Sequence, residues 1–236
     1  MLTALERVRR TLPLASRGDL EELLDVGDLT RTEIAANLRD LARLNRLPGG
    51  SAASVRAIER LASSPTPSVI DVGAGLGDIA RAFARRSWRV TAVDTNPSVL
   101  AEARRHAGNV VTIVEADARA LPFPARAFDV AHCSLLVHHL DPADAVDVLR
   151  EMGRVARHGI VINDLRRGLL PLVATALSVV AVGRSRVTRA DGITSVRRAY
   201  TLAELDELIA AAGLRVAWRS GGWMPRVVTA ATRSGA

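Results

Sequence analysis

The spacing of apolar residues changes near residue 68. Before that point, Ile34, Leu38 and Leu41 follow one another at intervals of four and three residues, which predicts an amphipathic helix. From there on, short apolar runs alternate with helical patterns. The runs are SVIDV (68–72), RVTAVD (89–94), VVTIVEA (110–116), FDVAHCS (128–134) and GIVIND (159–164). Strands that alternate with helices predict a parallel sheet covered by helices on both faces.

The C-terminal part departs from this alternation. A helix pattern begins at Thr201, where Glu204 completes a capping-box sequence. Two further apolar runs, LRVAWRS and WMPRVVTAAT, flank Gly221 and Gly222, and this arrangement is typical of a hairpin. We therefore expect an α/β fold with a seven-stranded, mostly parallel sheet whose last strand is antiparallel.

Two segments lie outside the alternating region. Residues 1–64 are predicted to form an N-terminal helical cap, which the sequence SSPTPS links to a domain of residues 65–236. An insertion at 166–200 follows the fifth strand. Its apolar run LLPLVATALSVVAV (169–182) is shorter than the ~20 residues that span a bilayer, and it predicts a helix over the cleft. The Arg-rich end of the insertion is interpreted either as a contact for an acidic substrate or as a solvated loop.

The composition limits the classes of molecule that the protein is expected to bind. The net charge of +7 comes from arginine alone, because the chain contains no lysine. The arginines are interleaved with acidic residues, as on solvated helix faces, and aromatic residues make up only 3% of the chain, so nucleic acid is not expected as a substrate. The single cysteine, Cys133, and an N-terminus without a signal-peptide pattern predict a cytoplasmic protein with no membrane span. The sequence does not decide whether the protein forms a homodimer.

The sequence VIDVGAGLGD (69–78) places a glycine-rich turn directly after the first strand of the sheet, where open parallel sheets bind their ligands. A Walker A phosphate loop needs a lysine, which is absent. The dinucleotide fingerprint needs a third glycine where Asp78 stands, and a carboxylate there would repel a pyrophosphate. S-adenosylmethionine carries a sulfonium, an amino group and no phosphate, so Asp71 and Asp78 would stabilise its amino group. It is the cofactor that this turn fits.

Four motifs in order resemble those of class I S-adenosylmethionine-dependent methyltransferases. They are VIDVGAGLGD, an acidic residue that ends the second strand, VEADA after the third strand, and FDVA at 128–131. The resemblance implies a Rossmann-like fold. It also implies that Asp94 holds the two ribose hydroxyls, that Asp117 accepts from the adenine amino group, and that the backbone of Ala118 contacts the ring. The alternative is that both aspartates only cap helices.

Outside this core, NLRDLARLNRLPGG, VINDLRRG and ITSVRRAYT resemble a subgroup of bacterial small-molecule methyltransferases found near type III polyketide synthases. The resemblance implies O-methylation of a phenolic or polyketide-derived small molecule in secondary metabolism. It also implies that Arg39, Asn45 or Arg46 helps to close the cofactor site, since the carboxylate of the cofactor needs a cation. The candidate cofactor-binding residues are Asp71, Gly73, Ala74, Gly75, Gly77, Asp94, Thr95, Asp117, Ala118, Ser134 and Arg46.

A phenol or alcohol acceptor must lose its proton during the in-line transfer of a methyl group. His138, and after it His139, are the candidate bases in CSLLVHHLDP, and Asp164 after the fifth strand is the candidate residue that orients them. Asn163 and Arg166 are candidate substrate contacts. The structural alternative is that one histidine packs inward or caps a helix. No metal-ligand pattern is predicted.

Ser134-Leu135-Leu136 stands where methyltransferases of nucleobases or protein glutamine carry an Asn/Asp-Pro-Pro-Tyr/Phe motif, which favours a small-molecule acceptor. Two alternatives to O-methylation stay open. One is C-methylation of an electron-rich aromatic or quinone precursor, which needs a phenolate but no dedicated base for the acceptor. The other is a protein of this fold that binds the cofactor without transferring the methyl group.

Overall fold

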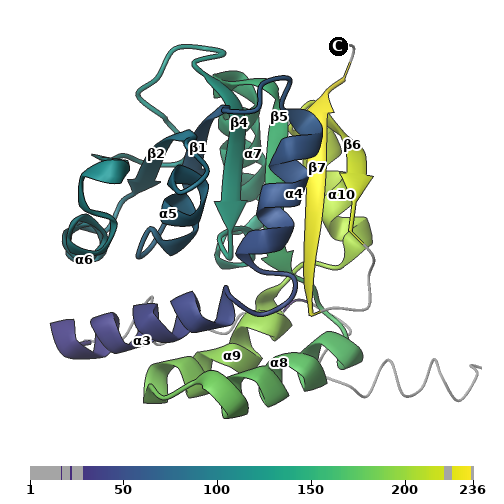
Figure 1. Cartoon of the computed structure of the whole chain (residues 1–236). Helices are drawn as coiled ribbons and strands as arrows, with labels where there is room; N and C mark the ends of the chain where they lie inside the picture. Colours follow the sequence, from purple (N-terminus) through teal and green to yellow (C-terminus); the bar gives the residue numbers. More distant parts are fainter. Residues whose placement is uncertain (1–16, 18–21, 23–28, 221–224, 235–236) are drawn as a thin grey trace, which may run out of the picture.

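A computed structural model of the chain describes residues 17, 22, 29–220 and 225–234. Its centre is a seven-stranded sheet in the order β3-β2-β1-β4-β5-β7-β6 (Figure 1). Neighbouring strands pair in parallel except at β7, which is antiparallel to both β5 and β6. The strands are β1 (Ser68–Val72), β2 (Arg89–Asp94), β3 (Thr112–Glu115), β4 (Phe128–Ser134), β5 (Ala156–Leu165), β6 (Leu214–Arg219) and β7 (Arg226–Arg233). The predicted α/β fold is confirmed, whereas the glycine pair at 221 and 222 lies outside the described residues.

Helices cover both faces of this sheet. Within the described ranges, the α-helices are α3 (Arg31–Leu44), α4 (Ser51–Leu61), α5 (Asp78–Ala84), α6 (Pro97–Ala107), α7 (Pro142–Val155), α8 (Leu169–Val182), α9 (Arg186–Arg198) and α10 (Leu202–Ala211). Leu149, Met152 and Leu208 bring α7 and α10 into the core on one face, and Ile58 and Phe83 bring α4 and α5 into the core on the other. Successive strand side chains point to opposite faces, so the short apolar runs supply both cores.

Capping boxes fix the starts of α3, at Thr30 and Glu33, and of α10, where the predicted box at Thr201 and Glu204 is confirmed. In α3 and α10, the threonine hydroxyl accepts from the backbone N–H of the glutamate, and the glutamate accepts from the backbone N–H of the threonine. Helix α4 packs on the sheet, while α3 lies across the carboxyl ends of its strands (Figure 1). The division of the chain between residues 64 and 65 stays a prediction.

The insertion after β5 forms the helix pair α8 and α9. The apolar run is a helix as predicted, and the Arg-rich stretch after it is a helix rather than a loop. The pair lies with α3 at the carboxyl ends of the parallel strands, at the bottom of Figure 1. The two helices pack so closely that a Cβ at Gly192 would lie 2.8 Å from Val179 Cγ2. No helix among the described residues is long and apolar enough to cross a membrane.

Gly159 on β5 lies too close to β7 for a side chain. Its φ is +151°, and a Cβ there would be 2.5 Å from the carbonyl oxygen of Ala231. We expect Gly159→Ala to lower the free energy of unfolding by about 2–4 kcal/mol, from the clash and the backbone strain together. Gly213→Ala is the control in urea unfolding, since its φ is +79° but nothing lies within 4 Å. It should cost only about 1 kcal/mol. Equal losses in the two variants would contradict the close approach of β5 to β7.

Asp129 near the start of β4 ties that strand to β1. Its Oδ2 accepts from the backbone N–H and the hydroxyl of Ser68, each at 2.8 Å, and its Oδ1 accepts from Arg157 at 3.1 Å. Burial alone would raise the pKa of the Asp129 carboxyl, but these donors lower it below its usual value. A folded-state pKa below the unfolded one gives stabilisation that is present above about pH 4 and is lost as pH falls through the folded pKa.

The variant Asp129→Asn should therefore be less stable than the wild type at neutral pH. The difference in the free energy of unfolding should shrink as pH falls below about 4, because the carboxylate is protonated first in the unfolded chain and, at lower pH, in the folded wild type. Urea unfolding over a pH series measures this difference. A difference that does not change with pH would count against the ionised role of Asp129.

Candidate functional site

The glycine-rich turn after β1 has a backbone geometry that allows a ligand to approach closely. Gly73, Gly75 and Gly77 have φ values of +66°, +55° and +72°. A Cβ at Gly73 would also lie 2.8 Å from Leu136 Cδ1. Glycine adopts these conformations without a steric penalty, and α5 begins directly after the turn. The turn therefore presents bare backbone at the carboxyl edge of the sheet.

A cavity of about 410 Å³ lies against this turn. Asp94 at the end of β2 is held in place at its wall, because Oδ2 accepts from the Gly75 N–H and Oδ1 from the Asn96 N–H, each at 3.0 Å. The predicted cofactor residues that line the cavity are Asp71, Gly73, Ala74, Gly75, Asp94, Thr95, Ala118 and Ser134, together with Asp78. The structure thus brings most of the predicted set to one cavity.

Three predicted cofactor residues are not among those that line this cavity. Asp117 is bound by Arg119, whose Nη2 donates to Asp117 Oδ2 at 2.8 Å, and this pairing lowers the pKa of Asp117. Both side chains of this ion pair are exposed to solvent. Arg46 is exposed to solvent, and Gly77 is the N-cap of α5. Of the polar residues predicted at the end of α3, Asn45 is the one that reaches the cavity.

A continuous network of buried polar side chains runs beneath the cavity. His132 Nδ1 lies 2.6 Å from Asp71 Oδ1, and His132 Nε2 lies 2.9 Å from the hydroxyl of Ser54. A carboxylate only accepts, so Nδ1 carries the proton and Nε2 accepts from Ser54. The same hydroxyl oxygen accepts from Asn163 Nδ2 at 2.8 Å. Residues of α4, β4 and β5 thereby hold Asp71 in position under the glycine turn.

Arg226 at the start of β7 extends this network to the end of α3. Its Nε donates to Asn163 Oδ1 at 3.0 Å, Nη1 donates to Asn45 Oδ1 at 2.6 Å, and Nη2 donates to Ser134 Oγ at 2.5 Å. Asn45 in turn donates to Asp78 Oδ2 at 3.1 Å. A single guanidinium therefore connects the end of α3 to β4 and β5.

Burial shifts the pKa values of two charged groups in the network. It raises the pKa of Asp78, while the hydrogen bond from Asn45 opposes the shift and the charge of Asp71 adds to it. Burial lowers the pKa of Arg226 to about 10, against the neighbouring charges of Asp164 and Asp78. Because that value lies well above neutral pH, the guanidinium keeps its charge. The network thus holds a cation that is linked to Asp78 of this cavity through Asn45, although Arg226 itself does not line the cavity.

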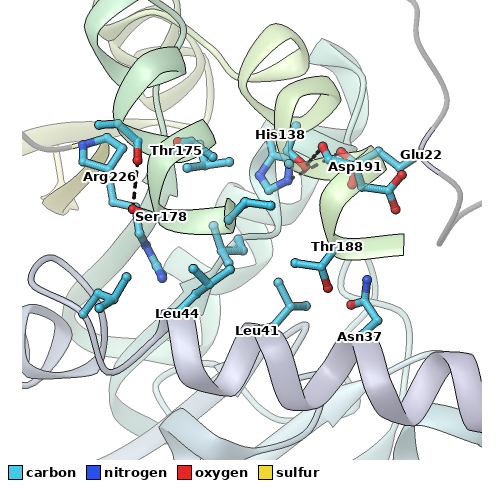
Figure 2. Close-up of a pocket in the computed structure, with 18 of the residues that line it drawn as sticks. Glu22, Asn37, Leu41, Leu44, His138, Thr175, Ser178, Thr188, Asp191 and Arg226 are labelled. Atoms are coloured by element: carbon cyan, nitrogen blue, oxygen red, sulfur yellow. Dashed lines mark hydrogen bonds and ion pairs between the residues drawn. The ribbon is translucent and has the colours of Figure 1, made fainter. Parts of the chain in front are cut away.

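A second cavity, of about 480 Å³, lies between the sheet edge and the helices α3, α8 and α9 (Figure 2). Leu44 and Val179 are typical of its largely aliphatic wall. The two cavities share Leu41, Leu135 and His139 in their linings. Leu135 has a φ of +54°, which is uncommon for a leucine and marks a strained position in the loop after β4. The cavities therefore adjoin at that loop.

The predicted pair of His138 and Asp164 is assembled at the second cavity. His138 Nδ1 lies 2.5 Å from Asp164 Oδ1, and the carboxylate also accepts from the backbone N–H groups of Val137 and Leu165, each at 2.7 Å. Burial alone would raise the pKa of Asp164, but the charge and hydrogen bond of His138 and the Leu165 N–H lower it. The carboxylate holds a proton on Nδ1, so Nε2 is the ring nitrogen that can accept when only Nδ1 carries a proton.

His139 packs against His138, with 4.2 Å between the ring centroids. Glu22 approaches both rings: its Oε1 is 3.8 Å from His138 Nε2, and its Oε2 is 3.9 Å from His139 Nε2. One ligand atom from each of the three residues lies within 4.8 Å of the others, and two histidines with a glutamate could hold a divalent metal ion. The sequence did not predict this set, because Glu22 is more than a hundred residues from the histidines.

Neither predicted substrate contact is among the residues that line the two cavities. The amide of Asn163 is fully used, since Nδ2 also donates to the carbonyl oxygens of Gly49 and Gly50. Arg166 is half-buried, and its backbone N–H donates to the carbonyl oxygen of Pro225 at 3.2 Å. Asn163 thus supports the site from behind rather than facing a ligand.

Three residues of the buried network were not predicted. Arg226 has no local signal, since it is one of many arginines and its position follows from the pairing of β7 with β5, where it lies opposite Leu165. His132 has a weak signal, because a histidine inside the strand FDVAHCS needs a buried polar partner. Ser54 is a small polar residue on a helix, and nothing in its surroundings in the sequence distinguishes it.

Known proteins resemble this chain over its central part. Residues 69–159 match the sequence family described as a methyltransferase domain. The ubiquinone/menaquinone biosynthesis C-methyltransferase UbiE of Hahella chejuensis is 32% identical over 122 residues, which are 48% of this chain and 48% of that protein. The malonyl-[acyl-carrier protein] O-methyltransferase of Salmonella typhimurium is 36% identical over 116 residues, which are 48% of this chain and 45% of that protein. The chain spans about half the length of these curated relatives.

A solved structure with a similar fold is the O-methyltransferase NcsB1 from neocarzinostatin biosynthesis, in complex with S-adenosylmethionine and 2-hydroxy-5-methyl naphthoic acid. It is 22% identical with a TM-score of 0.52, and the match covers 71% of this chain and 49% of that chain. At this identity the likeness shows the fold alone. Residues 69–159 thus resemble a methyltransferase domain, and the likeness to the solved O-methyltransferase shows a shared fold.

Proposed function

We propose that the protein transfers a methyl group from S-adenosylmethionine to a hydroxyl oxygen of a phenolic or polyketide-derived small molecule. The observation that carries this proposal is the junction of two unlike cavities at Leu135 and His139. One cavity has bare glycine backbone and carboxylates, and the other has aliphatic walls beside a histidine–aspartate pair. A donor in the first and an acceptor in the second would meet at the junction, and alignment of this kind supplies much of the rate of an in-line transfer.

The residues of the first cavity fit the cofactor. Asp78 lies where the amino group of the cofactor would bind beside the glycine turn, and Asp94 offers a carboxylate to the ribose hydroxyls. Asn45 of this cavity, backed by the Arg226 guanidinium that lines the second cavity, would serve the carboxylate of the cofactor, in place of the exposed arginines that the sequence suggested. When bound, the cofactor supplies an activated methyl group on a sulfonium. The protein then has to hold the acceptor, remove its proton and exclude water.

On the acceptor side, His138 would take the hydroxyl proton. Asp164 holds the Nδ1–H, so the lone pair of Nε2 is left for the acceptor. His139 packs on this ring at the junction of the cavities. The aliphatic side chains from α3 and α8, among them Leu44 and Val179, would exclude water and favour an apolar acceptor.

C-methylation of an electron-rich aromatic or quinone precursor is the second candidate function. It is favoured by the match to the relative from Hahella chejuensis, which is named as a C-methyltransferase. Such a reaction needs a phenolate, so the same pair of His138 and Asp164 would serve it. The product distinguishes the two functions, because nuclear magnetic resonance shows whether the new methyl carbon is bound to oxygen or to carbon.

Cofactor binding should depend on Asp94 far more than on Asp117. The variant Asp94→Ala removes a charged acceptor from the cavity wall and should weaken binding of S-adenosylhomocysteine by about 10- to 100-fold, the range for a lost hydrogen bond to a charged group. Asp117→Ala is the matched control, since its carboxylate is paired with Arg119 outside the cavity. It should change the affinity by less than about threefold. Isothermal titration calorimetry measures both, and equal losses would show that Asp117 faces the cofactor after all.

Turnover should depend on His138 without a matching effect on cofactor binding. With labelled cofactor and a panel of phenols and naphthols, His138→Gln should lower kcat by about 100-fold or more, as expected for a lost general base. The affinity for S-adenosylhomocysteine should stay within about twofold of wild type, because His138 does not line the first cavity. His139→Gln is the comparison and should retain most of the activity.

The other outcomes of this experiment each point to a different account. A larger loss in His139→Gln would make His139 the base, and undiminished turnover in both variants would remove the base from the mechanism. Tight cofactor binding with no methyl transfer in the wild type would favour the alternative that binds without transfer. A loss of wild-type turnover with a chelator would instead assign Glu22, His138 and His139 to a metal ion.

A further inference from the structure

The exposed apolar surface is concentrated on α8 and α9. Seven large hydrophobic side chains are exposed in the part of the chain that the structure describes, and six of them lie on these two helices. Five belong to α8, including Leu177 at 66% exposure and Val180 at 77%. Scattered apolar residues are ordinary on a protein surface, but a contiguous group is typical of a binding surface.

The exposed residues of α8 form a row along one side of the helix. Leu170, Val173, Leu177 and Val180 recur at intervals of three and four residues, so they share one side of a helix that is about 21 Å long. Another side is buried and lines the second cavity through Val179. The helix contains no charged residue. It is therefore apolar toward solvent and uncharged toward the cavity, where Thr175 and Ser178 add hydroxyl groups to the lining.

Leu170 connects the cavity with the outer surface. Its side chain is 57% exposed, and it is also one of the residues that line the second cavity. A residue with both properties lies at the mouth of the cavity. The row of exposed apolar residues therefore begins where the proposed acceptor site opens.

The surface next to this row is cationic. Arg184, Arg186 and Arg189 are all exposed directly after α8, whereas Asp191 of α9 is buried and lines the cavity. Arg186 has an acidic partner in Glu33, with Nη2 at 2.7 Å from Oε1. Two copies of this face would bring like charges together, which disfavours self-association. A surface with anionic groups outside and an apolar interior would complement both features, because its anionic groups would face the arginines and its interior would face the apolar row.

We propose that the outer face of α8 and α9 docks on an anionic lipid surface. This face consists of Leu169, Leu170, Val173, Leu177, Val180 and Ile193, with the three exposed arginines beside them. Apolar helix faces of this kind are buried about 5–10 Å into the boundary between headgroups and acyl chains, and arginines bind the anionic headgroups. An apolar acceptor dissolved in the lipid would then enter the cavity at Leu170 without crossing water. This delivery rests on the proposed function, whereas the docking itself does not.

Sedimentation of the full chain with lipid vesicles tests the docking. The wild type should bind vesicles that contain phosphatidylglycerol, and binding should fall at least about tenfold on pure phosphatidylcholine or at high salt. The double variant Leu177→Gln/Val180→Gln should lower the partition coefficient about 10- to 100-fold, because each side chain loses its burial in lipid. Val110→Gln is the matched control, since Val110 is 60% exposed on the short 3-10 helix Gly108–Val110. It should leave binding unchanged.

The proposal is wrong if the wild type does not bind the vesicles. It is also wrong if Val110→Gln lowers vesicle binding as much as the double variant does. Analytical ultracentrifugation without lipid tests whether a second copy of the chain binds to this face instead. A dimer that the double variant dissociates would assign the face to a second copy of the chain. A monomer that binds no vesicles would assign it to another segment of the chain itself. Either result replaces the lipid surface.

Methyl transfer to a water-soluble phenol separates this proposal from the proposed function. The double variant should keep wild-type turnover, because neither Leu177 nor Val180 lines the second cavity. A wild type that binds vesicles but transfers no methyl group would contradict the proposed function and leave the docking surface in place. A wild type that transfers methyl groups but binds no vesicles would contradict the docking surface and leave the proposed function in place.

Discussion

The buried guanidinium of Arg226 is the group on which the arrangement of the site depends. It donates to Asn45 at the end of α3, to Asn163 on β5 and to Ser134 at the end of β4. A charge inside a protein costs several kcal/mol unless it is paired and hydrogen-bonded, so these three acceptors offset a large penalty. Loss of any one of them would leave part of the charge unsatisfied. The position of α3 over the sheet is therefore coupled to β4 and β5.

That coupling gives the site two compartments of opposite character. Leu38 of α3 lines the cavity at the glycine turn, Leu44 lines the cavity under α8, and Leu41 between them lines both. On the sheet side, the strained Leu135 borders both cavities as well. One helix and one loop thus separate a compartment suited to a charged cofactor from one suited to an apolar acceptor. In-line transfer needs this kind of fixed juxtaposition, because most of its catalysis is alignment.

The sequence predicted features that depend on neighbouring residues, but it did not predict contacts between residues that are far apart in the chain. Strands such as Ser68–Val72 and Phe128–Ser134 have the predicted bounds, because alternation and glycine turns are short-range patterns. The pairing of His138 with Asp164 follows from a general rule, since both stand at carboxyl ends of neighbouring strands. Asp117 forms an ion pair with Arg119, a contact that the motif around Asp117 does not indicate. Arg226 depends on how β7 pairs with β5, and nothing near it in the sequence encodes that partner.

The central claim is that donor and acceptor meet where the two cavities adjoin. A crystal structure of the full chain with S-adenosylhomocysteine and a naphthol-type acceptor, such as 1,4-dihydroxy-2-naphthoic acid, tests it most directly. We expect the sulfur of the product beside Leu135 and His139, the ribose hydroxyls on Asp94, and the acceptor hydroxyl about 3 Å from His138 Nε2. A sulfur that points away from Leu135, or an acceptor bound outside the cavity under α8, would contradict the account.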